Sequence, residues 1–430
     1  MILLLFLFMF VLIGIGMSIW LAMGISAAVY ILIQEEMSLR LVASSMVAGV
    51  DIPTLVAIPF FILAGELMNR SGITRKLTEL ADYFVGRFKG GLAYVAVFVN
   101  IIIAGVSGSA VADASAVSSV LLPAMKQRGY DKAFSAAING AAAVIGPIIP
   151  PSIPMIFIGI ISGISIGKLF LGGVIPGLLM AVALCVVIFT LSRRRDFPVT
   201  VVRHQIVMRT LLPLLRDSFF AVIAPLVIIF GVVFGVVTLV EVAVLANVYV
   251  LAVSLFVYRS IGWKEIPGIF VHAGVFACAI MIIFAVVGLF QYIVAFEQVG
   301  ERLGRLLATL NLDKYTFLLL ANVFFLVMGC VLDAIPIMLI FFPVLLPAAI
   351  ALGIDPTHFG VVVVLNLMIG LLTPPIGALL FVEAKIADLP FGDLVRTIWP
   401  FTLALIGVLV LITYVPGLVM WLPNLVFGQG

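Results

Sequence analysis

The sequence predicts an all-α polytopic membrane protein, and three observations carry this prediction. Of the 430 residues, 64% are hydrophobic and only 10% are charged, which excludes an ordinary soluble domain. Uncharged runs such as 2–33 and 134–167 are long enough to cross ~30 Å of hydrocarbon. These runs lack the apolar–polar alternation of barrel strands, so we expect helices to span the membrane.

The N-terminal apolar run has no basic residues before it and no A-x-A-like end, so we interpret it as membrane-embedded and not as a cleaved signal. Its length is large for one span and small for two, which leaves the side of the N-terminus open. Further spans are expected at 53–68, 169–191, 219–238, 240–258, 270–290 and 399–419. Two stretches with charges at helical spacing, 70–89 and 297–314, predict amphipathic surface helices. A charged loop is expected at 383–396.

Several function classes are disfavoured by composition. The net charge of +3 comes from basic residues in short loops, which does not suggest nucleic-acid binding. The three cysteines lie in apolar segments without metal-like spacing and are expected to pack as small hydrophobes. The three histidines are scattered, so neither a zinc site nor a catalytic triad is supported. We therefore expect a protein that is not an enzyme.

The main local signal is an interruption of the apolar sequence that occurs twice, about 220 residues apart. The first copy reads G-V-S-G-S-A-V-A-D over 105–113, with Pro123 ten residues on, then G-P-I-I-P-P-S over 146–152. The second reads M-G-C-V-L-D over 328–333, with Pro343 ten residues on, then G-L-L-T-P-P-I-G over 370–377. Broken backbone at membrane depth survives only where protein buries it or a cavity hydrates it. Paired interruptions of this kind indicate a transporter binding site.

Loop charges favour a topology in which 92–125 and 315–350 are re-entrant hairpins. With both hairpins entering and leaving on one side, the loops 70–89, 126–132, 193–216, 259–268 and 383–396 share a side and hold 18 of the 23 basic residues. If both segments crossed the membrane once, this asymmetry would collapse. The hairpin topology makes the two repeats inverted, the first opening to the cytoplasm and the second to the outside.

The hairpin tips and the proline breaks are the candidate site. Half-helices that meet at mid-membrane leave carbonyls suited to a hard cation such as sodium and amides suited to a carboxylate. The first tip offers Ser107, Gly108, Ser109 and Asp113, faced by Gly146, Pro147, Ile149, Pro150, Pro151 and Ser152. The second tip offers Gly329 and Asp333, faced by Gly370, Thr373, Pro374 and Pro375. We expect the substrate to meet Ser109, Asp113, Pro151, Ser152, Asp333, Pro374 and Pro375.

Simpler roles compete with these assignments. A single Ser-Gly tract usually marks a close helix contact, and a single proline pair usually marks a kink. Asp113 and Asp333 either bind cation or substrate, or cap the hairpin helices. Asn139 and Asn366 precede the proline pairs and either bond a tip or serve helix packing. Carboxylates near span ends, at Glu66 and Glu241, are expected to be solvated or paired.

The two motif runs, extended by L-L-P-A-M and R-G-Y in the first half and by G-I-D-P-T-H-F-G in the second, resemble the large membrane subunit of tripartite ATP-independent periplasmic (TRAP) transporters. The resemblance covers nearly the whole chain. It implies a sodium-driven elevator, with scaffold helices in 1–69 and 166–290, arm helices in 70–91 and 291–314, and a last span in 383–430. The transport repeats would be 92–165 and 315–382, with broken helices at 133–165 and 358–382.

The resemblance also implies ligands and partners. One sodium site would use Ser107, Gly146, Ile149 and Pro150, and a second would use Gly329, Gly370 and Thr373; Cys330 departs from the small or hydroxylated residues common there. A periplasmic substrate-binding protein would deliver a small organic acid, a carboxylate or sugar acid. A separate small four-helix membrane subunit is expected, and a location in the bacterial inner membrane. Alternatives are a stand-alone sodium/dicarboxylate symporter, a channel and an intramembrane enzyme.

Overall fold

The computed structural model describes residues 2–34, 40–86, 88–194, 215–216, 218–221, 223, 226–227, 230–232, 237–299, 302 and 312–428, without the side chains of 104–107 and 194. Every regular element in these ranges is a helix. Six helices of the described part are long and apolar enough to cross a membrane. They are α10 (Ile166–Arg194), α12 (Leu239–Ala252) with its π-helical extension η2 (Val253–Val257), α13 (Ile266–Phe296), α15 (Lys314–Val331), α16 (Ala334–Ala351) and α19 (Phe391–Tyr414).

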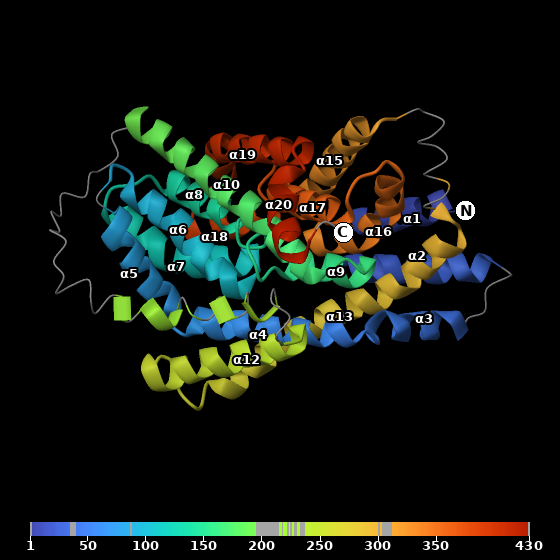
Figure 1. Cartoon of the computed structure of the whole chain (residues 1–430), viewed down its shortest axis with the longest axis horizontal. Coiled ribbons are helices and arrows are strands. Elements are labelled where there is room, and N and C mark those ends of the chain that lie inside the picture. The colour runs from blue at the N-terminus through green and yellow to red at the C-terminus, as the bar shows by residue number, and fades with distance from the viewer. Residues whose placement is uncertain are drawn as a thin grey trace.

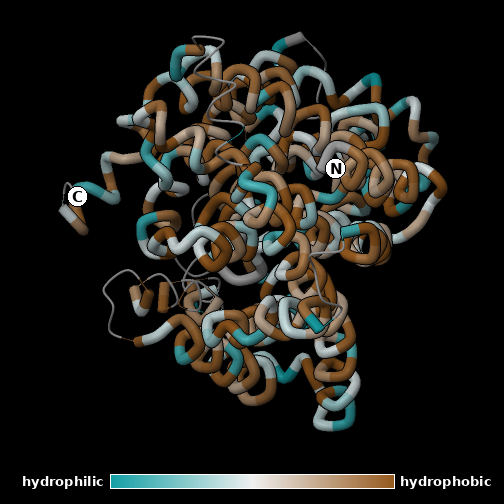
Figure 2. The backbone as a smooth tube through the Cα atoms, turned by 90° about the vertical axis from the view of Figure 1, so that its right-hand side faces the viewer, coloured by the Kyte–Doolittle hydropathy of each residue, from teal (hydrophilic) through white to brown (hydrophobic). Residues whose placement is uncertain are grey.

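The N-terminal apolar run forms two short helices, α1 (Ile2–Gly14) and α2 (Ile19–Ile33). The turn between them uses Gly16 at φ +96°, a conformation that glycine adopts without steric cost. Apolar residues dominate the helices throughout the chain (Figure 2). Such all-round apolarity is expected when a bundle faces lipid outside and protein inside.

One layer of the molecule contains α3 (Arg40–Val50), α4 (Ala57–Arg70), α12 and α13, along the bottom of the view in Figure 1. The helices α3 and α4 are joined through the 3-10 turn Pro53–Val56 and bend by 59°, so that together they could form a seventh span. Helices α3 and α13 cross where Gly49 meets Gly288. A Cβ added to Gly49 would lie 2.9 Å from the Cα of Gly288, so this close crossing requires glycine.

Two units of similar construction lie above this layer (Figure 1). The first unit consists of the helix pair α6 (Gly91–Ser107) and α7 (Ala110–Gln127), followed by α8 (Lys132–Ala143) and α9 (Ile153–Ser162) with a break between them. The second unit consists of the pair α15 and α16, followed by α17 (Pro356–Gly370) and α18 (Ala378–Ala387), again with a break. Each unit buries its third helix most deeply: every residue of α17 from Thr357 onward is buried.

The long helix α10 packs with these units. It contacts α6, α8, α9, α17, α19 and α20 (Gly417–Phe427). A Cβ on its Gly173 would lie 2.2 Å from the Ile148 carbonyl oxygen, so α10 lies directly against the first break. We expected 166–290 to belong to a scaffold. The division into domains stays a prediction; in the structure α10 contacts helices of both units.

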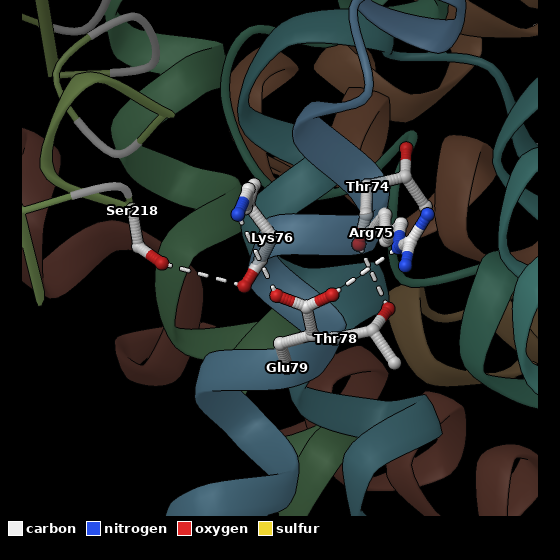
Figure 3. Close-up of polar contacts among 6 residues, drawn as sticks. All are labelled: Thr74, Arg75, Lys76, Thr78, Glu79 and Ser218. Atoms are coloured by element: carbon white, nitrogen blue, oxygen red, sulfur yellow. Dashed lines mark hydrogen bonds and ion pairs between the residues drawn. The ribbon is translucent and has the colours of Figure 1, made fainter. Parts of the chain in front are cut away.

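The amphipathic stretch near residue 80 forms α5 (Ile73–Val85). Its apolar side buries Ile73 and Leu77, while Glu79 pairs with Arg75 at 3.2 Å and with Lys76 at 3.7 Å. The Ser218 hydroxyl donates to the Lys76 carbonyl at 3.3 Å, which ties a distant segment to this helix (Figure 3). Of the second expected arm, 291–314, the first six residues belong to the end of α13, and 300–301 and 303–311 lie outside the described residues.

One expectation about the C-terminal part is wrong. We expected a charged loop to begin at Glu383, but this residue lies within α18 and is fully buried. The neighbouring charges, Lys385 and Asp388, are exposed, as a loop would have them. Of these three charged residues, only Glu383 lies on the buried side of α18.

Candidate functional site

Each helix pair turns at a tip that is built from small and capping residues. In the first tip, Gly108 ends α6 at φ +58° and Ser109 caps α7 by accepting a hydrogen bond from the Ala112 amide. In the second tip, Asp333 caps α16 and accepts from the Ala334 amide at 2.8 Å. The two aspartates therefore differ: Asp333 is a helix cap, whereas Asp113 lies one turn inside α7.

Both breaks contain a cis peptide bond within their proline pair, Pro150–Pro151 and Pro374–Pro375. After the first break, Ser152 caps α9, accepting from the Met155 amide at 3.1 Å and donating to the Pro147 carbonyl. In the described part of the chain, no backbone amide donates a hydrogen bond to the carbonyl of Gly146, Ile149 or Pro150. These oxygens lie in irregular backbone, where they can serve a ligand.

Each tip lies directly on the break of its own unit. A Cβ added to Gly108 would lie 2.8 Å from the Pro151 carbonyl oxygen, so tip and break are in backbone contact. In the second unit, a Cβ added to Gly370 would lie 2.8 Å from the backbone of Gly329. The amide of Gly377 also donates to the Cys330 carbonyl at 3.1 Å. Glycine is required at these crossings because no side chain fits between the two backbones.

Asp113 reaches the first break from the side. Its side chain is fully buried, and a Cβ added to Gly146 would lie 2.3 Å from Asp113 Oδ2. The carboxylate therefore packs against the point where α8 ends. A buried carboxylate at the end of a broken membrane helix is a candidate for cation binding or for holding the break.

A cavity of about 220 Å³ lies where the two units meet. It is lined by both tips, both breaks and α13; the lining residues include Gly108, Ser109, Ala110, Val111, Pro147, Ile153, Pro154, Phe276, Ile280, Asp333, Ala334, Ile335, Met368 and Leu371. The N-termini of α7, α9 and α16 all contribute to this lining. Helix N-termini present amide groups and a positive dipole end, which favour a carboxylate.

A second cavity of about 230 Å³ shares Ser109, Val111, Ile153 and Phe276 with the first. It extends towards Glu66 and His272, at the end of α4 and on α13. Glu66 is paired with Arg70 at 2.8 Å, in line with the expectation that it is solvated or paired. The two adjoining cavities together connect the tips to the end of α4 that bears Arg70.

The structure brings together only some of the expected site residues. Ser109 and Asp333 line the cavity, whereas Asp113 and Ser152 are buried beside the first break. Pro375 is exposed, and Thr373 is buried with its hydroxyl donating to the Ile369 carbonyl at 2.8 Å. Ser107 ends α6, and its side chain lies outside the described residues. Within the described part, no group of three or more His, Cys, Asp or Glu residues could hold a metal ion.

Sequence reasoning missed two polar contacts beneath the site. In each unit an asparagine of the helix pair bonds an asparagine of the broken helix: Asn100 donates to Asn139 at 3.0 Å, and Asn366 donates to Asn322 at 2.9 Å. They could have been predicted from the sequence, because each half of the chain has one asparagine in the helix pair and one in the broken helix, within otherwise apolar segments. The other missed residue is Glu383, which lies beside Asn139.

Two helix pairs seated on two broken helices around a shared cavity, in a chain of apolar spans, define a membrane transporter of the broken-helix class. A solved structure with this fold is the YdaH transporter of Alcanivorax borkumensis, similar with a TM-score of 0.63 over 87% of this chain and 86% of that one. At 14% identity, this likeness concerns the fold alone.

The sequence profile of the tripartite ATP-independent periplasmic transporter, DctM component, matches residues 6–418. The chain is 34% identical to the sialic acid TRAP transporter large permease protein SiaM of Vibrio cholerae over 94% of each chain. It is 36% identical to the C4-dicarboxylate TRAP transporter large permease protein DctM of Pseudomonas aeruginosa, again over 94% of each. The chain therefore belongs to the TRAP transporter large permease family, whose members are transporter subunits and not enzymes.

Proposed function

We propose that this permease imports a small organic acid, a carboxylate or sugar acid, driven by sodium through an elevator mechanism. The observation that carries the proposal is the single cavity lined by both tips and both breaks. Such a cavity offers helix N-termini to a carboxylate, and Pro147 and Leu371 in its lining belong to the two breaks, whose irregular carbonyls suit cations. The relatives named for sialic acid and C4-dicarboxylate support an organic acid as the substrate class.

The sodium sites we propose use oxygen donors of the two breaks. The first would take the carbonyls of Gly146, Ile149 and Pro150, together with Ser107. The second would take the backbone of Gly329 and Gly370 and the hydroxyl oxygen of Thr373, which keeps a lone pair while it donates to Ile369. Hard cations prefer such neutral and carbonyl oxygens, so the donor set fits sodium.

The substrate would lie in the 220 Å³ cavity against Ser109 and the N-terminus of α16. The carboxylate of Asp333 faces the same cavity, so an anionic substrate would approach it only with a cation or a hydroxyl group between them. The backbone around Pro151, Ser152, Pro374 and Pro375 would close the two sides, and Asp113 would support the first break.

The elevator motion would carry the two inverted units against the layer of α3, α4, α12 and α13. Support comes from the lining of the cavity, which combines both units with Phe276 and Ile280 of α13. Sliding at this boundary would expose the site alternately to the two sides of the membrane. In this mechanism α5 and the second amphipathic stretch act as arms at the membrane surface.

Two partners complete the proposal: a periplasmic substrate-binding protein that delivers the organic acid and a small four-helix membrane subunit, all at the bacterial inner membrane. The test is uptake into proteoliposomes that contain this chain with its neighbouring small subunit. We expect labelled acid to accumulate only with an inward sodium gradient and with the binding protein present. Uptake without a binding protein would instead indicate a stand-alone sodium/dicarboxylate symporter, and uptake indifferent to sodium would contradict the driving force.

A further inference from the structure

A single carboxylate of the second unit is held by the first unit. Glu383 of α18 is fully buried, and its two oxygens accept from different helices. The Ser118 hydroxyl of α7 donates to Oε2 at 2.7 Å, and the Asn139 amide of α8 donates to Oε1 at 2.8 Å. Among the described residues, no Lys, Arg or His pairs with Glu383, so neutral donors alone hold it.

The hydrogen bonds continue into a third helix of the first unit. Asn139 Nδ2 also reaches the Ala114 carbonyl at 3.1 Å and Ser118 Oγ at 2.7 Å, while Asn139 Oδ1 accepts from Asn100 of α6 at 3.0 Å. Two helices of the first unit therefore bond one side chain of the second, and α6 is linked to it through Asn139. We call Asn100, Ser118, Asn139 and Glu383 the inter-unit cluster.

Close packing accompanies these hydrogen bonds. A Cβ added to Gly140 would lie 3.2 Å from Glu383 Cγ, so α8 makes room for the glutamate with a glycine. Nearer the surface, Lys132 at the start of α8 donates to the Asp388 carbonyl at 3.4 Å, just beyond α18. The contact between the units is thus continuous from the surface inward.

We propose that Glu383 is a positioning residue that fixes the first tip and break relative to the second break, so that both halves of the site move together. This inference rests on the proposed sodium-coupled function. Ser118 lies eight residues beyond Ala110, the first residue of α7, and Glu383 lies five residues beyond Ala378, the first residue of α18. At 1.5 Å per helical residue, they are about 12 Å and about 8 Å from the site ends of their helices. Loosening the cluster would let the two half-sites drift apart.

Glutamine and alanine at this position separate geometry from charge. In Glu383→Gln, Oε1 can still accept from Asn139 and Nε2 can donate to Ser118, so the spacing is kept. In Glu383→Ala both contacts vanish and the donors of Ser118 and Asn139 lose an acceptor. Thr402→Val is the matched control, since Thr402 is a buried polar residue that bonds only its own helix at Ile398.

The first readout is the sodium dependence of uptake in proteoliposomes. We expect Glu383→Ala to raise the half-saturating sodium concentration about tenfold, which corresponds to one lost buried hydrogen bond, with a much smaller change in the maximal rate. Glu383→Gln and Thr402→Val should stay within about twofold of wild type. An unchanged sodium requirement in Glu383→Ala overturns the proposal, and so does a Glu383→Gln variant as impaired as Glu383→Ala, because the carboxylate charge would then be the functional feature.

The second readout is amide hydrogen exchange on the purified protein, which needs no transport. We expect Glu383→Ala to speed exchange in both α7 and α18, and Glu383→Gln to leave both near wild type. Faster exchange in α18 alone, or in neither helix, overturns the inference. A wild-type protein without sodium-dependent uptake would refute the proposed function, and the exchange result would still decide whether Glu383 couples the units.

Discussion

In the first unit Asn100 meets Asn139, and in the second Asn322 meets Asn366, so the same amide pair joins helix pair to broken helix in both. The two pairs have different outer partners. Asn139 continues to Glu383 of the other unit, whereas Asn322 donates to Thr413 of α19 at 2.9 Å. The difference indicates that the first unit is tied by polar contacts to its opposite unit and the second to the C-terminal helix. Two units of similar construction can thus share a site geometry and still be held by unlike contacts.

The two breaks differ in which atoms lie against their glycines, Gly146 and Gly370. Alanine substitutions at these two glycines should therefore show the largest difference in uptake and stability between the units. At Gly370 an added methyl would meet the Gly329 backbone at 2.8 Å, which cannot move without shifting a helix. At Gly146 the shortest contact, 2.3 Å, would be with Oδ2 at the end of the Asp113 side chain, and the nearest backbone atom, the Ala143 carbonyl oxygen, would lie at 3.1 Å. We expect Gly370→Ala to reduce uptake to less than about a tenth and to cost about 1–3 kcal/mol of stability, and Gly146→Ala to cost less on both counts.

Gly407→Ala is the control for this pair, because a Cβ there meets nothing within 4 Å. Uptake and thermal unfolding of the three variants should rank Gly370→Ala as most damaging. Equal damage at Gly146 and Gly370 would mean that Asp113 is held as rigidly as a backbone.

The asparagine pairs should give the next largest effect. Asn139→Ala removes the amide that serves Asn100, Ser118 and Glu383, and it leaves a buried carboxylate with one donor fewer. We expect it to destabilise the protein by about 2–3 kcal/mol, against about 1 kcal/mol for Asn366→Ala, which leaves only neutral groups unpaired. Thermal unfolding in detergent measures the order. A reversed order would show that the inter-unit cluster is less important than the α15–α17 pair.

Replacing the outer partner of the second pair should have a smaller effect. Thr413→Val removes the acceptor of Asn322, which keeps its link to Asn366. We expect a loss of about 1 kcal/mol and a half-saturating sodium concentration within about twofold of wild type. A change as large as that expected for Glu383→Ala would show that α19 also positions the site.

The contacts of α5 should give the smallest effect. Arg128, just after α7, makes a two-point pair with Asp82 of α5 at 2.8 and 3.0 Å, and this carboxylate raises the pKa of Arg128. A raised folded-state pKa gives stability that is present at all pH below the unfolded value and is lost only as pH rises through the folded one. Asp82→Asn should therefore cost at most about 1 kcal/mol, equally at about pH 6 and pH 8. Thermal unfolding at both pH values measures this, and a loss confined to one of them would contradict it.

The interruptions could be predicted from sequence because their signals are local. Glycines, a proline pair and an aspartate combine within apolar sequence at 105–152 and again at 328–377, and both tips and both breaks fall there. The ten-residue spacing from Asp to Pro is the same in both copies and suggested that Asp113 and Asp333 have the same role. In the structure their roles differ. Helix α16 begins directly after Asp333, whereas α7 begins three residues before Asp113, because Ser109 supplies the cap. Which of two capping residues starts a helix depends on the packing of the tip.

The inter-unit cluster could not be predicted because its partners are far apart in the chain. Ser118 and Glu383 are separated by 265 residues, and no local pattern links them. Glu383 also lies near Lys385 and Asp388, so the local sequence resembles a solvated loop. Glu383 is buried because it lies on the face of α18 that the first unit covers. Which face is covered depends on the tertiary arrangement and cannot be inferred from the local sequence.

We propose that the two breaks hold cations that act together. This is tested by the sodium-concentration dependence of uptake for wild type and Thr373→Val, an isosteric change that removes one hydroxyl from the second break. We expect a sigmoidal curve for wild type and a higher half-saturating sodium concentration in Thr373→Val, with little change in thermal stability because the lost hydroxyl donates to the Ile369 carbonyl one turn back, a local bond of small worth. A hyperbolic wild-type curve, together with an unchanged sodium requirement in the variant, would contradict it.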